Sequence, residues 1–268
     1  MELITKHIPP EYLALRIDYC KQQLELLPKY RLQTHSLNGV PTLMVLSDGH
    51  KHRADSEPGK QMIEQMRLRE YHDRQLQVYE AMWFADQRGK PFSECKAHRV
   101  KRTMYYAPGK SVLLNREFFD SLENDANHDY PKSHDYPFNG IYYRSAVERD
   151  IAICYTEMGI PFKTEPAVYL SGLSYPIYPD FVTYIQELDN CKFHEHFGIK
   201  QSSSYLRTTS IKYQNYTNAG LVPELDILFT HDVTEMPFDI RSFVSKLNSA
   251  IYTTAIVTQP REWQEATG

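Results

Sequence analysis

The chain has 268 residues and a formal net charge of −4 at pH 7, which excludes the overall basic field that many nucleic-acid-binding proteins carry, although a local basic patch remains compatible with it. The four cysteines are scattered without a Cys-x-x-Cys pair, so neither a disulfide framework nor a structural zinc site is indicated. No signal peptide and no apolar run of membrane length is found, so we expect a cytoplasmic protein with no membrane partner.

The first part of the chain predicts helices and one hairpin. Apolar residues recur every three or four positions in Pro9–Leu27, and Pro28 ends that helix. The pair Asn38-Gly39 between two short strand-like runs is a strong signal for a β-hairpin. A long helix is predicted over Gly59–Asp86. These helices offer a surface for a second copy of the chain or for another protein.

A second helix is predicted over Lys90–Tyr105, in the most basic stretch of the chain. Cations spaced around a helix suit contacts to the nucleic-acid backbone. The candidate nucleic-acid-binding residues here are Lys96, Arg99, Lys101 and Arg102.

A polar segment, Asn115–Asn139, is rich in Asp, Asn, His, Pro and Ser and is typical of a junction between two units. We therefore predict two domains. Residues 1–135 form a mostly helical accessory domain that carries the hairpin, and residues 136–268 form a second domain of mixed α/β class.

The second domain predicts an alternation of helices and strands. A helix over Ser145–Met158 stops at Gly159, as helices commonly do at glycine. Three aromatic and β-branched runs follow and predict strands; they are Phe162–Leu170, Ile177–Ile185 and Cys191–Phe197.

A helix over Ser203–Ala219 is predicted next, and it ends at Gly220. Leu225–Thr230 predicts a fourth strand, and Phe238–Ile251 predicts a closing helix. The order up to that fourth strand is α-β-β-β-α-β.

Three carboxylates stand among apolar neighbours in these elements: Glu148, Asp180 and Glu195. Carboxylates are rarely buried without a partner, and a cation shared between them is one way to supply it. The sequence therefore predicts a common site for the three.

Four short motifs, each on the expected element, resemble the PD-(D/E)xK nuclease superfamily, in particular a bacterial and phage-type branch whose third strand ends in Glu-His-Phe-Gly. They are Arg144-Ser145-x-x-Glu148, Gly159-Ile160-Pro161-Phe162, Pro179-Asp180-Phe181 and Glu195-His196-Phe197-Gly198. The resemblance covers roughly residues 138 to 247. It implies a restriction-endonuclease-like αβββαβ core.

The same resemblance implies metal-dependent hydrolysis of phosphodiester bonds, with DNA favoured over RNA as substrate. Asp180 and Glu195 are then expected to hold Mg²⁺ or Mn²⁺, and Glu148 to bind a second ion or to orient the first. Arg144 either orients Glu148, touches the nucleic-acid backbone or forms a structural salt bridge.

The chain departs from the superfamily at the motif lysine, because Phe197 occupies the position two residues after Glu195. A phenyl ring cannot donate to a phosphate, so either another lysine replaces it or the site is inactive. Lys212 on the following helix is the first candidate for a catalytic lysine. Lys200 and His196 are further candidates, although strand alternation points His196 away from Glu195.

Two readings from other classes stay open. The chain could be a catalytically inactive nucleic-acid-binding module on the same fold, for which Phe197 is the argument. It could also be a structural or interaction protein whose N-terminal helices bind another chain. The retention of three costly buried carboxylates argues against both.

Overall fold

The computed structural model describes residues 8–47, 49–87, 96–107, 110–198, 203–232 and 238–258. The chain divides into two compact units, one built mainly from His98–Ile256 and the other mainly from Leu13–Ala97. The class is mixed α/β, as the sequence predicts. The expected domain boundary at residue 135 differs from the observed division, which falls near residue 97.

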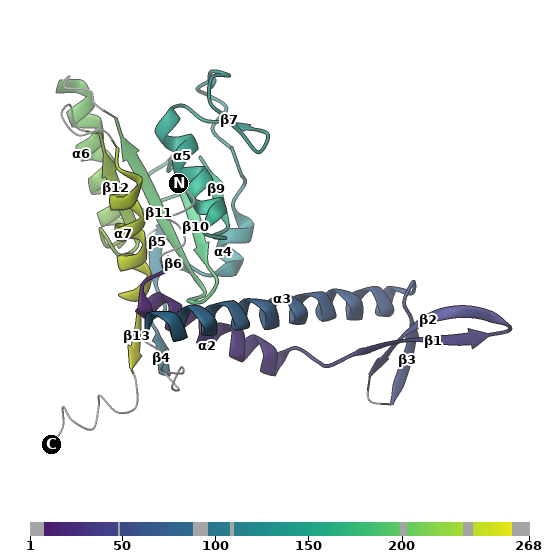
Figure 1. The fold of residues 1–268 in the computed structure, drawn as a ribbon. Helices are drawn as coiled ribbons and strands as arrows, with labels where there is room; N and C mark the ends of the chain where they lie inside the picture. The colour runs from purple at the N-terminus through teal and green to yellow at the C-terminus, as the bar shows by residue number, and fades with distance from the viewer. Residues whose placement is uncertain are drawn as a thin grey trace. The chain divides into compact units, whose positions relative to one another are not determined.

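The Leu13–Ala97 unit contains two helices and a three-stranded antiparallel sheet of order β1-β2-β3 (Figure 1). Its elements are α2 (Pro10–Leu26), β1 (Arg31–Leu37), β2 (Val40–Ser47), β3 (His50–Arg53) and α3 (Glu57–Asp86). Both helices and the hairpin are confirmed. The short strand β3 was not predicted, because its sequence is entirely basic and carries no apolar alternation.

Helix α3 begins at a tight corner. The Ser56 side chain accepts a hydrogen bond from the backbone N–H of Gly59 at 3.2 Å, which satisfies one free donor of the first turn. A Cβ atom on Gly59 would lie 1.9 Å from the carbonyl oxygen of Arg53. Only glycine therefore fits at this position.

One arginine joins the two helices of this unit. The Arg69 guanidinium on α3 donates to the carbonyl oxygens of Leu24 at 2.5 Å and Leu27 at 2.7 Å. These carbonyls lie at the end of α2 and lack partners within that helix. Arg69 thus satisfies the C-terminus of α2.

The His98–Ile256 unit holds the central sheet and several small ones. Its elements are β4 (Lys96–Arg99), β5 (Thr103–Ala107), β6 (Lys110–Leu113), α4 (Arg116–Ser121), β7 (Pro137–Phe138), β8 (Ile141–Tyr142), α5 (Ala146–Glu157), β9 (Phe162–Thr164), β10 (Phe181–Ile185), β11 (Asn190–Phe197), α6 (Ser203–Asn218), β12 (Ile227–His231), α7 (Ile240–Tyr252) and β13 (Ala255–Thr258). The elements from α5 to β12 follow one another in the order α-β-β-β-α-β.

The prediction of a helix over Lys90–Tyr105 is wrong. Residues 96–99 and 103–107 form strands, which pair with β13 and β6 respectively, and the start of the predicted helix lies outside the described residues. The stretch contains β-favouring Val100, Thr103 and Tyr105, and the pairing partners decide its conformation.

The central sheet has four strands in the order β12-β11-β10-β9. Strands β9, β10 and β11 are antiparallel neighbours, whereas β12 runs parallel to β11. The first two strands are shorter than predicted, because Glu165 has a φ of 40° and is followed by Pro166, and because Pro179 stands just before β10. Between them only Val168 and Ile177 form an isolated bridge.

Helices cover both faces of this sheet. On one face, α4 and α6 contribute Phe118 and Tyr216 to an apolar cluster around Phe193 of β11. On the other face, Tyr155 of α5 and Phe243 of α7 pack against His194. The alternation of side chains along β11 separates the two layers.

The apolar cluster also explains why the boundary does not fall at residue 135. Met104 of β5, Leu114 and the α4 phenylalanines Phe118 and Phe119 are buried in the same cluster as Phe193. The first part of the polar segment Asn115–Asn139 is therefore a helix packed on the sheet and not an inter-domain junction.

Candidate functional site

Two of the predicted acidic residues meet at one end of the central sheet. Phe181 of β10 pairs with His194 of β11, and one further step in this antiparallel register places Asp180 opposite Glu195. Glu195 is 1% exposed. Its face is set by strand alternation, since Phe193 and Phe197 on the same strand lie in the α6-side cluster.

Helix α6 supplies both partners of the Glu195 carboxylate. The Lys212 ammonium lies 2.7 Å from Oε2, and the hydroxyl of the buried Tyr216 donates to Oε1. These two residues are four positions apart and therefore share one face of the helix. Burial and the negative charge of Glu195 raise the pKa of Tyr216 well above its ordinary value, so the phenol stays a hydrogen-bond donor.

Asp180 is the second acid of the pair. Its Oδ2 accepts a hydrogen bond from the backbone N–H of His196 at 2.6 Å. Burial, and then the charge of Glu195, raise the pKa of Asp180 well above its ordinary value, while Lys212 opposes that rise. The two carboxyls and the ammonium thus form one electrostatic unit.

Phe197 lies on the Glu195 side of β11, as strand alternation predicts. Its ring is buried and stacks on Phe229 with ring centroids 5.8 Å apart and on His231 at 5.1 Å. The phenylalanine at the motif-lysine position therefore packs the layer between the sheet and α6. Lys212 approaches Glu195 from that same layer.

Glu148 has a role in helix geometry. The Ser145 hydroxyl accepts from the backbone N–H of Glu148 at 3.1 Å, and the Glu148 carboxylate accepts from the Ser145 hydroxyl and from the backbone N–H of Arg144, each at 3.1 Å. This arrangement is close to a capping box at the start of α5. Burial, and more weakly Glu165, raise the pKa of Glu148.

The expected group of three metal ligands is not formed. Within the part of the chain that the structure describes, no three His, Cys, Asp or Glu side chains are grouped so that they could hold a metal ion. The Glu148 carboxylate forms its own hydrogen bonds at the start of α5, although its charge still acts on Asp180 and helps to raise the pKa of that acid.

Glu165 is a buried acid that the sequence reasoning missed. Its carboxylate lies 2.7 Å from the Arg144 guanidinium and 2.5 Å from the Lys132 ammonium, and its backbone N–H donates to the carbonyl oxygen of Asp180 at 3.1 Å. The signal was present, because Glu165 stands in an apolar run just as Asp180 does. Arg144 thus forms the structural salt bridge that was one of its three predicted roles.

The opposite face of β11 carries a chain of hydrogen bonds between neutral groups. Tyr155 Oη lies 3.0 Å from His194 Nδ1, and Thr230 Oγ1 lies 2.8 Å from His194 Nε2 and 2.9 Å from His196 Nδ1. Burial lowers the pKa of His194 to about 3. His196 points away from Glu195, as predicted, and its ring joins the ends of β11 and β12.

The predicted basic cluster does not lie on one helix. Arg102 forms a two-pronged pair with the buried Asp226 at 2.9 and 2.6 Å, and Arg99 donates to the carbonyl oxygen of Glu187 at 2.6 Å. Lys101 is exposed, and the side chain of Lys96 lies outside the described ones. Arg102 therefore stabilises the segment just before β12, and Arg99 stabilises the turn between β10 and β11.

The residues present still fit one divalent cation. Mg²⁺ in proteins commonly uses one or two carboxylates and keeps several waters, so a group of three acids is not required. Burial, and then the negative charge of Glu195, raise the pKa of Asp180, and a bound cation would offset the charge of the two acids. Asp180 and Glu195 would hold such an ion.

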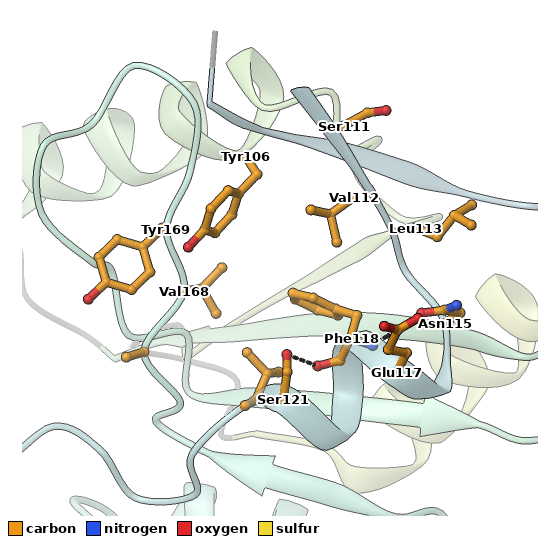
Figure 2. A pocket seen from close by; sticks show the side chains of 12 residues that line it. Tyr106, Ser111, Val112, Leu113, Asn115, Glu117, Phe118, Ser121, Val168 and Tyr169 are labelled. Carbon is orange, nitrogen blue, oxygen red and sulfur yellow. Dashed lines mark hydrogen bonds between the residues drawn. The ribbon is translucent and has the colours of Figure 1, made fainter. Parts of the chain in front are cut away.

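A separate pocket of about 620 Å³ lies in the same unit, between β6, α4 and the segment after β9 (Figure 2). Its lining residues are Tyr106, Ser111, Val112, Leu113, Asn115, Glu117, Phe118, Ser121, Leu122, Ala167, Val168 and Tyr169. Neither member of the acidic pair lines it.

Comparison of this chain with protein-family models, with curated proteins and with solved structures gave no match. Among the described helices, none combines the length and the apolar character that a membrane span requires.

Proposed function

We propose that the chain is a nuclease that depends on a divalent metal ion and hydrolyses phosphodiester bonds, with DNA favoured over RNA. The observation that carries the proposal is the contact between the Lys212 ammonium and Glu195 beside Asp180. Two acids and a lysine are the set that the resemblance to PD-(D/E)xK nucleases implies. Here the lysine comes from α6 instead of β11.

The element order supports the same proposal. The resemblance implies an αβββαβ core with a Glu on the first helix and an Asp and a Glu on adjacent strands. Asp180 directly precedes β10 and Glu195 lies in β11, within the observed order from α5 to β12. Fold alone would not be sufficient, because one fold hosts many functions.

Asp180, Glu195 and Lys212 would have different roles in the reaction. When bound, Mg²⁺ or Mn²⁺ would lower the pKa of a water molecule and polarise the scissile phosphate. Asp180 and Glu195 would hold the ion, the His196 backbone N–H fixes the Asp180 carboxyl, and the Tyr216 hydroxyl fixes that of Glu195. Lys212 would offset the negative charge that develops on the phosphate oxygens.

The test is cleavage by the purified chain. Plasmid, linear and single-stranded DNA, and RNA, are incubated with Mg²⁺ or Mn²⁺ and, in parallel, with a chelator. We expect cleavage only with metal, and none by Glu195→Gln. If the folded protein cuts none of these substrates with either metal, the nuclease proposal is rejected.

A catalytically inactive nucleic-acid-binding or protein-interaction module is the competing proposal. One observation favours it: both carboxylate oxygens of Glu195 already have partners, Lys212 and Tyr216. Such a module would bind nucleic acid or a protein partner without metal-dependent cleavage. The same assay, run beside a binding measurement, separates the two.

A further inference from the structure

The pocket outside the acidic pair presents aromatic and polar groups at different places. The Tyr106 and Tyr169 rings meet edge to face, with centroids 6.0 Å apart, and are 40% and 46% exposed. Figure 2 shows them on one side of the pocket, Phe118 between, and Asn115 and Glu117 on the other side. Exposed aromatic rings beside a buried apolar floor suit a flat aromatic ligand.

The polar side has a defined pattern of donors and acceptors. Asn115 Oδ1 accepts from the backbone N–H of Phe118 at 3.1 Å, so its amide nitrogen is directed to act as a donor. Glu117 is exposed and offers two acceptor oxygens. The polar lining therefore includes an amide NH₂ donor group and a carboxylate, together with the hydroxyls of Ser111 and Ser121.

This pattern distinguishes among nucleobases. Guanine places two N–H donors side by side on its Watson–Crick edge, next to a carbonyl oxygen. A carboxylate can accept from both donors, and an amide N–H can donate to the carbonyl. Each of the other DNA bases offers a single N–H or NH₂ donor group on that edge. The charge of Glu117 also disfavours a phosphate in the pocket, so the base itself is the group that enters.

The pocket lies on the face of the sheet that carries Glu195. Its floor residue Phe118 packs against Phe193 of β11, with ring centroids 6.2 Å apart. Glu195 follows Phe193 by two residues on the same face, a rise of about 7 Å along the strand. The pocket and the acidic pair are therefore on the same face of the central sheet.

We propose that this pocket binds an unpaired guanine base of a single-stranded nucleic acid, with its face on one of the Tyr106 and Tyr169 rings, its edge toward the other, and its Watson–Crick edge held by Glu117 and Asn115. The inference rests on the proposed function for the identity of the strand. It assigns to that function a preference for single strands that contain guanine.

The test measures binding without cleavage. Fluorescence anisotropy in the presence of a chelator gives Kd for an oligothymidine and for the same oligomer with one central guanine. We expect the wild-type chain to bind the guanine oligomer about tenfold more tightly. Glu117→Gln removes the preference, and the double variant Tyr106→Ala with Tyr169→Ala weakens binding of the guanine oligomer about tenfold or more.

Glu123→Gln is the matched control, because Glu123 is an exposed glutamate that does not line the pocket and the charge change is identical. It should keep the guanine preference. Competition with free dGMP and dAMP then separates a strand from a nucleotide as the ligand. The proposal is overturned by equal or no binding of the two oligomers, by an unchanged preference in Glu117→Gln, or by binding of free dGMP alone.

The outcome for the pocket is separable from that for the nuclease. Lys212→Ala should cut about a hundredfold more slowly and keep the guanine preference. A chain that prefers guanine but never cuts would sustain the pocket and reject the nuclease. A chain that cuts without any guanine preference would support the nuclease proposal and reject the guanine pocket.

Discussion

The Lys212 ammonium lies 2.7 Å from Oε2 of Glu195, although the two residues stand 17 positions apart on a helix and a strand. Tyr216, one turn further along the same helix, donates to the other oxygen. The long lysine stem lets the charge reach a carboxylate that is 1% exposed while Phe197 fills the layer beside it. A residue distant in sequence thereby takes the place next to the acid.

Lys212→Ala should lower the rate of metal-dependent cleavage by about a hundredfold or more, the scale on which one charge-stabilising donor acts. Affinity for DNA should stay nearly unchanged, because one phosphate contact among many is lost. Arg207→Ala, which removes an exposed cation from the same helix, is the control and should cut at the wild-type rate. Equal rates for both variants would refute the role of Lys212.

Asp180→Asn should abolish metal-dependent cleavage and leave the metal-free protein as stable as the wild type or more stable. The raised pKa of Asp180 means that its ionised form destabilises the folded state at neutral pH, and the amide oxygen can still accept from the His196 N–H. Thermal unfolding in a chelator measures this. A large drop in Tm would show that the charge of Asp180 has a structural partner.

Glu165→Ala should destabilise the fold by about 3 kcal/mol, because Arg144 and Lys132 lose their buried carboxylate. The cost stays at the low end of the range for a broken buried pair, since Lys132 keeps Asp125 and Arg144 keeps the carbonyl oxygen of Tyr130. Denaturant unfolding gives the change in free energy. Glu123→Ala removes an exposed carboxylate and should stay within about 0.5 kcal/mol of the wild type. A comparable small change in Glu165→Ala would mean that the ion pairs contribute little.

The free energy of unfolding should decrease at acidic pH, partly because His194 is buried in its neutral form. Burial lowers the pKa of this imidazole to about 3 in the folded chain, whereas its ordinary value is 6.5. Between these values the unfolded chain binds more protons, so the free energy of unfolding decreases as the pH falls, by about 1.4 kcal/mol per pH unit from this group.

His194→Gln removes this titration. The slope of its unfolding free energy between pH 6 and pH 4 should be smaller than that of the wild type by about the same 1.4 kcal/mol per pH unit. Parallel slopes for the two proteins would show that His194 titrates normally in the folded state.

Periodicity and turn chemistry were sufficient for the long elements. The helices α2, α3 and α5 and the hairpin at Asn38-Gly39 lie close to their predicted bounds, because amphipathic spacing and local turn residues specify them without distant partners. The face of β11 that carries Glu195 was also predictable, since side chains alternate along any strand.

Tertiary contacts decided what local pattern could not. Residues 96–99 and 103–107 form strands because they pair with partner strands, and α4 joins the core because Phe118 packs against Phe193. The sequence motifs predicted Glu148 as a metal ligand and gave Glu165 no role. In the structure, Glu148 accepts hydrogen bonds at the start of α5, whereas Glu165 pairs with two cations from distant segments, Lys132 and Arg144. The sequence shows which residues carry a charge. The partner of a buried charge depends on which segments the fold brings within a few ångströms of it, and that depends on the whole chain.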